Sequence, residues 1–207
     1  MKAVLPLVLE GDLPGSPAGK VYAEAALRLL EQGGSTGCVL VTSPGPGQGR
    51  STTAANLSLS LLEQKVPVML LEITDGQPHM ESTFGASPNR RGVEDVLRGR
   101  GTLDEVVCRR SDSGLYLAMM RRSVPLDLDS PARRKCLEEL LTYARQRCAW
   151  VVIDGPSGRD SASLQVLAEC VTSVLVVVEQ RVTRRAALRA QLAQLESYSP
   201  YVLMTVA

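Results

Sequence analysis

The sequence predicts an α/β fold with a mostly parallel central sheet and helices on both faces. Two observations indicate this fold. Short apolar segments alternate along the chain with segments of helical periodicity, and the short segments are apolar at consecutive positions, as in strands buried on both faces. The 207 residues, 44% of them hydrophobic and 22% charged, suit one domain with a sizeable core.

Each element follows from its local pattern. Six apolar segments are expected as strands: residues 38–42, 66–71, 115–119, 150–153, 174–178 and 201–206. Five segments with helical periodicity are expected as helices: residues 18–32, 51–64, 131–147, 160–170 and 183–197. We expect residues 1–17 to form an N-terminal tether before a single domain at 18–207, and residues 76–114 to hold turns and short helices.

Charge and apolar length make several classes of protein unexpected. The net charge is +1, from 23 basic and 22 acidic residues, so nucleic acid is not an expected partner. No segment approaches the ~18 apolar residues of a membrane helix, and no signal-peptide pattern is present, so we expect a cytoplasmic chain without direct membrane insertion. The five widely spaced cysteines are expected as reduced core thiols. Paired arginines are expected on solvated helix ends and loops, with a docking surface for an acidic partner as the alternative.

A glycine-rich loop at residues 43–52 lies between the first strong strand and a helix, and it reads SPGPGQGRST. Such a turn points several backbone N–H groups at one position, where the helix dipole adds about half a positive charge. A standard P-loop reads G-x-x-x-x-G-K-[ST], so Arg50 stands at the lysine position and Ser51 at the Mg²⁺-binding hydroxyl. The alternative is a turn that only caps the helix. The expected ligands are ATP or ADP with Mg²⁺, and the expected binding residues are Gly47, Gln48, Gly49, Arg50, Ser51 and Thr52.

Asp154 is the strongest acidic candidate because it follows a buried strand at the carboxyl end of the sheet, where ligands bind. There it is expected to reach a Mg²⁺ ion held through Ser51, as a catalytic and metal-binding residue. The alternative is a turn cap made with Pro156 and Ser157. Asp75 is interpreted as a surface-loop residue rather than a replacement carboxylate, and His79 as a solvated side chain rather than a metal ligand.

Residues 46–57 (PGQGRSTTAANL) are similar to the P-G-x-G-K-S-T-x-x-x-N-L segment of bacterial tyrosine kinases, which are MinD/ParA-like P-loop ATPases tied to capsule and exopolysaccharide export. Residues 68–78 resemble the family's h-h-h-h-D-x-D-x-R-x-P segment, residues 92–99 its G-L-x-D-V-L-x-G segment, and residues 151–156 its Walker B strand. The resemblance covers roughly residues 19–206. It implies a P-loop NTPase fold, with ATP and Mg²⁺ as cofactors.

The departures from the family pattern fall on the chemistry. Arg50 replaces the P-loop lysine, Glu72 and Thr74 replace the two aspartates of D-x-D, and Gly76 replaces the arginine. Thr205 stands where the family carries an adenine-reading asparagine. The resemblance implies a catalytic role for Glu72 only if the structure accommodates its longer side chain. At position 50, the planar guanidinium of Arg differs in shape from the compact ammonium group of Lys.

Three functions compete. The first is a degenerate P-loop domain with weak or lost ATP binding, acting in polysaccharide export as a cytoplasmic regulatory or scaffold partner. Its partner would be the cytosolic tail of a chain-length-determining membrane protein or an intact kinase relative. The second is an active ATPase or tyrosine autokinase, and the third a MinD/ParA-type spatial-positioning ATPase. A homo-oligomer is a further possibility, because the helix at 23–30 resembles an E-x-x-R-x-x-R oligomerisation helix, although Leu27 and Leu30 replace the arginines.

Overall fold

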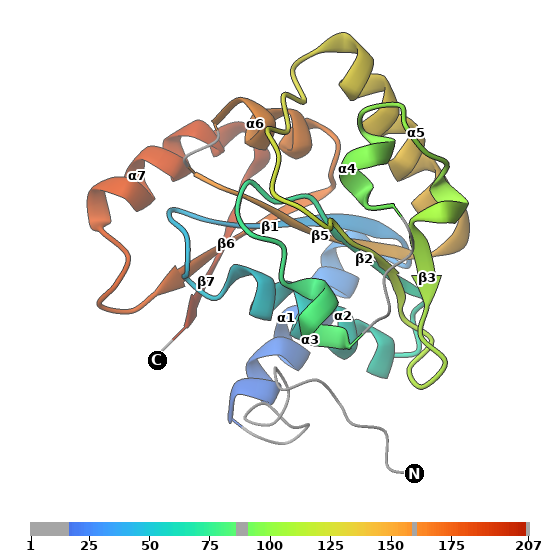
Figure 1. The fold of residues 1–207 in the computed structure, drawn as a ribbon. Helices are drawn as coiled ribbons and strands as arrows, with labels where there is room; N and C mark the ends of the chain where they lie inside the picture. Colours follow the sequence, from blue (N-terminus) through green and yellow to red (C-terminus); the bar gives the residue numbers. More distant parts are fainter. Residues whose placement is uncertain (1–16, 86–90, 159–160, 206–207) are drawn as a thin grey trace.

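A computed structural model describes residues 17–85, 91–158 and 161–205. Its sheet has seven strands in the order β3-β4-β2-β5-β1-β6-β7, and every neighbouring pair is parallel except the antiparallel pair β3–β4 (Figure 1). The strands are β1 (Gly37–Ser43), β2 (Val68–Glu72), β3 (Val107–Arg109), β4 (Tyr116–Ala118), β5 (Trp150–Ser157), β6 (Ser173–Glu179) and β7 (Tyr201–Thr205).

Helices cover both faces of the sheet (Figure 1). The helices are α1 (Pro17–Gly33), α2 (Arg50–Glu63), α3 (Met80–Phe84), α4 (Val93–Val96), α5 (Pro131–Arg147), α6 (Ser161–Glu169) and α7 (Arg185–Gln194), with short 3₁₀ turns η2 (Leu103–Glu105) and η3 (Glu196–Tyr198). Helices α1, α2 and α3 pack on one face, and α4 to α7 pack on the other. None of the helices in these ranges is long and apolar enough to cross a membrane.

Consecutive apolar residues of the central strands feed two separate cores. In β1, Cys38 and Leu40 belong to the core under α5 and α6, whereas Val39 and Val41 belong to the core under α1 and α2. All four side chains are fully buried. The period of two along a strand therefore explains why this segment is apolar at every position: each face of the sheet has a helix layer to cover it.

The predicted fold class is confirmed, and each of the six predicted strands is present with shifted ends. The three-residue strand β3 was not predicted, and it lies in the segment where only turns and short helices were expected. The expectation that all strands are buried on both faces is wrong for β7. Its side chains Tyr201, Val202 and Met204 are 42%, 49% and 59% exposed, because β7 is an outer strand paired on one side with β6.

Two further expectations concern the ends and the cysteines. The predicted tether lies outside the described residues except for Pro17, where α1 begins. The five cysteines are unpaired thiols, as predicted, but the expectation that they lie in the core is wrong for Cys108, Cys136 and Cys170, which are half-buried.

The topology brings three loops to one edge of the sheet. Strand β5 lies between β1 and β2 and runs parallel to both, with Asp154 in register with Val41 on one side and Glu72 on the other. The segments that follow these strands therefore leave the sheet side by side at its carboxyl edge, the usual ligand-binding edge of such sheets.

The entrance to β1 provides a stability test of this packing. A Cβ atom added to Gly37 would lie 2.6 Å from the ring of fully buried Trp150. We expect Gly37→Ala to lower the free energy of unfolding by about 1–3 kcal/mol, because the ring has to move. Urea denaturation followed by tryptophan fluorescence measures the change. Gly76→Ala is the control, since its nearest neighbour would lie 3.8 Å from the new Cβ. Equal losses in the two variants would contradict the packing argument.

Candidate functional site

The loop between β1 and α2 has the backbone of an anion cradle. Gly47 and Gly49 have φ angles of +72° and +76°, a region that other residues rarely adopt. Gly49 is the N-cap of α2 and has no side chain to bond the first amides of the helix. Gln48 between them is nearly buried. The first N–H groups of a fourteen-residue helix are thus left for a ligand to bind.

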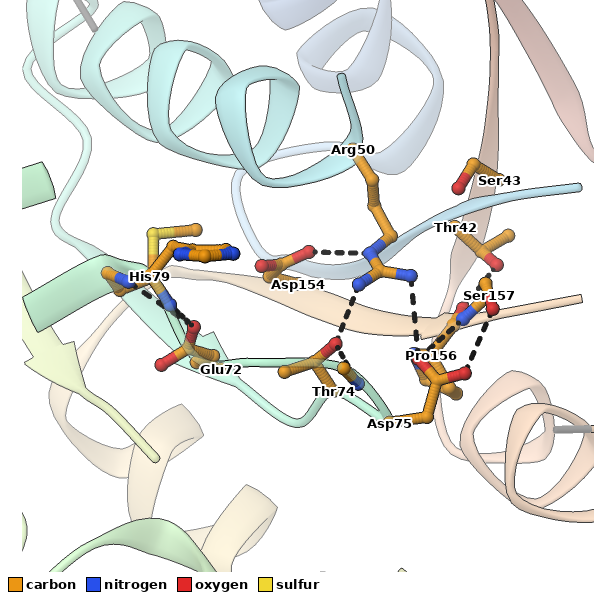
Figure 2. A network of polar contacts seen from close by, with 12 residues as sticks. Thr42, Ser43, Arg50, Glu72, Thr74, Asp75, His79, Asp154, Pro156 and Ser157 are labelled. Carbon is orange, nitrogen blue, oxygen red and sulfur yellow. Dashed lines mark hydrogen bonds and ion pairs between the residues drawn. The ribbon is translucent and has the colours of Figure 1, made fainter. Parts of the chain in front are cut away.

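Arg50, the first residue of α2, directs its guanidinium to the ends of β2 and β5 (Figure 2). Its Nη2 donates to Oγ1 of Thr74 at 2.6 Å and its Nε donates to Oδ1 of Asp154 at 3.1 Å. Its Nη1 lies 3.6 Å from Oδ1 of Asp75. The Arg50 side chain is only 12% exposed and the Asp154 side chain is fully buried. The predicted binding residue Arg50 and the predicted acid Asp154 therefore form an ion pair with each other.

Asp75 is part of this network, contrary to its interpretation as a surface-loop residue. Its Oδ1 accepts from the backbone N–H of Ser157 at 3.0 Å, and its Oδ2 accepts from the Ser157 hydroxyl at 2.9 Å. These bonds join the segment after β2 to the end of β5 (Figure 2). The sequence distance between the two residues concealed this pairing.

A second connection that the sequence reasoning missed supports the other side of the loop. The Thr42 hydroxyl donates to the Pro156 carbonyl at 2.7 Å and accepts from Nε2 of Gln191 at 3.0 Å. The same Nε2 lies 3.3 Å from the carbonyl of Ser43. Gln191 belongs to α7 and is buried. A glutamine on the inner face of a predicted helix was the available signal.

Glu72 has a different environment from the one expected of a catalytic carboxylate. Its Oε1 accepts from the N–H groups of His79 and Met80 at 2.9 and 3.3 Å, and its Oε2 accepts from that of Met120 at 3.1 Å. Burial raises the pKa of Glu72 to about 7, with the Asp154 charge adding to the rise and the three amides opposing it. Both oxygens are thus already bonded to backbone. The His79 side chain is exposed, as predicted.

Burial also raises the pKa of Asp154, against the opposing effects of the Arg50 charge and of hydrogen bonds from Ser51 and Arg50. Its Oδ2 is buried and has no hydrogen-bond partner in the described part of the chain. This oxygen and the Ser51 hydroxyl are the right chemical groups for Mg²⁺. The other two carboxylates described at this edge are engaged while Arg50 is in place, Glu72 by backbone amides and Asp75 by Ser157 and Arg50.

The residues as they stand therefore do not fit a magnesium ion, although Mg²⁺ on Ser51 and Asp154 was expected from the sequence. The acid that would bind it is paired with Arg50 at 3.1 Å. In the described ranges, no group of three or more His, Cys, Asp or Glu side chains is placed to hold a metal ion. The two predicted sites thus differ: the loop has the backbone expected of a phosphate-binding turn, whereas the acid predicted to bind Mg²⁺ is paired with a guanidinium.

Paired arginines lie mostly on the surface, as predicted, and several are bound by acids. Arg122 pairs with Asp95 at 2.5 Å, and Arg133 pairs with Asp127 at 2.6 Å. Such pairs reduce the positive field that a polyanion would meet.

The Glu72 environment predicts a pH dependence of stability. The pKa of Glu72 is about 7 in the folded chain against an ordinary value of 4.5, so between these pH values the folded state holds a proton that the unfolded state has lost. The free energy of unfolding therefore falls as pH rises through this window, by about 2–3 kcal/mol relative to Glu72→Gln. Urea denaturation of both proteins across the window measures the difference. Parallel curves would contradict the prediction.

No family model matches the sequence. Among curated proteins, the chain is 27% identical over 154 residues to the tyrosine-protein kinase YwqD of Bacillus subtilis (strain 168), a match covering 74% of this chain and 64% of YwqD. It is 21% identical over 197 residues to the tyrosine-protein kinase CpsD of Streptococcus agalactiae, covering 94% of this chain and 86% of CpsD. The chain thus spans less than two thirds of the length of YwqD.

Solved structures give the same result. The VpsO kinase domain has a TM-score of 0.76 and 28% identity, covering 91% of both chains. The kinase domain of the Escherichia coli tyrosine kinase ETK has a TM-score of 0.79 and 17% identity, covering 96% of this chain and 80% of its own. Cobyrinic acid a,c-diamide synthase from Mycobacterium smegmatis, solved with bound ADP and magnesium, has a TM-score of 0.65 at 19% identity, covers 83% of this chain and 74% of its own, and shows the fold alone. The homologues of this chain are therefore bacterial tyrosine kinases, as the sequence motifs indicated, and its fold is that of a P-loop NTPase.

Proposed function

We propose that this chain is a P-loop domain of the bacterial tyrosine kinase type in which phosphoryl transfer is lost. One observation carries the proposal: the Arg50 guanidinium is bonded to Thr74 at 2.6 Å and Asp154 at 3.1 Å at the end of the sheet. A P-loop lysine instead reaches the β- and γ-phosphates. In this chain the cationic side chain at the lysine position, Arg50, is bonded to Thr74 and Asp154 at the edge of the sheet instead.

The chemistry explains why this arrangement is expected to be inactive. Phosphoryl transfer depends almost entirely on positioning and on neutralising the charge of the phosphates. Removing one well-placed electrostatic contact costs about 10²–10³-fold in rate. Here Arg50 replaces the lysine, Thr74 brings no charge, and both Glu72 oxygens are bonded to amides. Three parts of the machinery are therefore altered together.

Nucleotide binding is a separate property. The positive φ angles of Gly47 and Gly49 form the loop, and its backbone N–H groups do not depend on the side chain at position 50. We therefore propose that ATP or ADP binds weakly, through the backbone of residues 47–52 and the Ser51 hydroxyl.

The resemblance to capsule and exopolysaccharide kinases supports a role in polysaccharide export. We propose a cytoplasmic regulatory or scaffold protein, recruited to the inner face of the membrane by the cytosolic tail of a chain-length-determining or export protein, or by an intact kinase relative. Helix α1 is available for self-association, since its Leu27 and Val21 are 44% and 45% exposed. An active autokinase and a spatial-positioning ATPase are the competing functions, and turnover separates the first of these from the proposal.

We expect ATP turnover and tyrosine autophosphorylation of the natural protein to equal background. The measurement pairs the natural protein with an Arg50→Lys, Glu72→Asp, Thr74→Asp variant under identical Mg²⁺ and ATP. Turnover that appears only in the triple variant would show a competent loop whose chemistry has been lost.

The control is Asp154→Ala, made in both backgrounds. If the natural protein hydrolyses ATP and Asp154→Ala abolishes the hydrolysis, phosphoryl transfer is retained and the proposal fails. Effects of residues that act together are not additive, so the three substitutions are tested jointly before they are separated.

Weak nucleotide binding is tested by calorimetry on nucleotide-stripped protein. We expect ADP to bind with a dissociation constant of roughly 10⁻⁴–10⁻³ M, and Gly47→Ala to weaken it further by straining the loop. Gly99→Ala is a matched control, because Gly99 also has a positive φ, +68°, and open space around its Cβ position, but lies away from the loop. A submicromolar constant, or equal effects of the two substitutions, would contradict a weak backbone site.

A further inference from the structure

We propose that the Arg50 guanidinium is the resident cation of this site, paired with the acid that the sequence predicted as a Mg²⁺ ligand, so that the loop takes a nucleoside diphosphate without metal. The nucleotide half of this inference rests on the proposed function, whereas the metal half stands on the ion pairs alone. The contacts that carry it are the hydrogen bonds from Nε and Nη2 of Arg50 to Asp154 and Thr74, and the 3.6 Å ion pair between Nη1 and Asp75.

Charge balance favours a resident cation here. Asp154 is fully buried on the central strand β5, where an ionised carboxylate is stable only beside a positive charge. Arg50 provides that charge at 3.1 Å, and its contact with Asp75 at 3.6 Å neutralises part of a second carboxylate. Glu72, the next carboxylate along the edge, is stabilised by backbone amides instead. Each of these three described carboxylates is thus bonded to protein groups, and Oδ2 of Asp154 is left over.

A magnesium ion would have to compete with these bonds. Mg²⁺ requires near-octahedral oxygen ligands at about 2.0–2.1 Å, so it would have to approach Asp154 beside a guanidinium that is 12% exposed. Displacing Arg50 would leave a largely buried cation without its acceptors on Thr74 and Asp154. Arg50 is held by several bonds at once, and a single oxygen of Asp154 is left over.

The remaining ligand chemistry is that of a phosphate group bound by backbone. The amides at the start of α2 are not capped by a side chain, and Gly47 and Gly49 hold the loop open by their φ angles. Such amides bind phosphate oxygens without a metal bridge. A nucleoside diphosphate suits this loop, since Arg50 stands at the position of the lysine that reaches the γ-phosphate and is bonded to Thr74 and Asp154 instead.

The metal half is tested with Mn²⁺ alone, followed by electron paramagnetic resonance on nucleotide-free protein. We expect no bound Mn²⁺ in the natural protein and one bound ion in Arg50→Met, which keeps the apolar stem and removes the charge. The additional Asp154→Asn substitution should abolish the ion in that background. Arg28→Met is the matched control, because Arg28 is an exposed arginine paired only with Glu24 on its own helix.

Asp154-dependent Mn²⁺ binding by the natural protein would overturn the proposal. A folded Arg50→Met protein that takes no Mn²⁺ would overturn it as well. If Arg50→Met does not fold, as judged by circular dichroism, the natural protein decides alone: absence of Mn²⁺ binding supports the resident cation, and its presence excludes it.

The nucleotide half is tested by ADP calorimetry in excess EDTA and in excess Mg²⁺. We expect dissociation constants that agree within about twofold, whereas tightening by Mg²⁺ of about tenfold or more would overturn metal-free binding. No ADP binding in either buffer would refute the proposed nucleotide function, and the Mn²⁺ result would still decide the metal half. ATP turnover by the natural protein would refute the loss of catalysis separately.

Discussion

The buried carboxylate of Asp154 is the constraint on which the site depends. A charge on the central strand of the sheet needs a partner at close range, and the partner here is Arg50 at 3.1 Å. Breaking such a buried pair by removing one side typically costs about 3–5 kcal/mol. The first residue of α2 is thereby fixed to the end of β5. The same bond directs the guanidinium to the edge of the sheet, where it also donates to Thr74.

Two carboxylates in register on neighbouring strands have separate roles. Glu72 and Asp154 are a register pair between β2 and β5, and the Asp154 charge helps to raise the pKa of Glu72. Glu72 accepts hydrogen bonds from the backbone amides of His79, Met80 and Met120. Asp154 is instead bonded to the Arg50 guanidinium. The first bonding scheme holds the chain after β2 against the sheet edge, and the second pairs the acid predicted to bind Mg²⁺ with a guanidinium. The Glu72 side chain therefore has a structural role, because it bonds the backbone of residues 79, 80 and 120.

The remaining bonds keep the edge of the sheet rigid. Asp75 joins Ser157 through two hydrogen bonds, and Thr42 links the Pro156 carbonyl to Gln191 of α7. The loop is thus supported from three strands and one distant helix. A backbone loop held in this way can bind phosphate oxygens with little reorganisation, as the proposed nucleotide binding requires.

The sequence by itself determined the α/β class, most of the elements and the position of the phosphate loop, because strand and helix periods, glycine positions and continuous apolar runs are local properties. It did not show strand β3, whose three residues are too short for a periodic signal, or the exposure of β7, because an outer strand can be as apolar as a central one. Only the tertiary structure decided where Arg50 points and that Asp75 belongs to the site. Arg50 and Asp154 are 104 residues apart, and Asp75 and Ser157 are 82 apart. These residues are close in space because β5 lies between β1 and β2 in the sheet. This strand order brings side chains from three loops within hydrogen-bonding range.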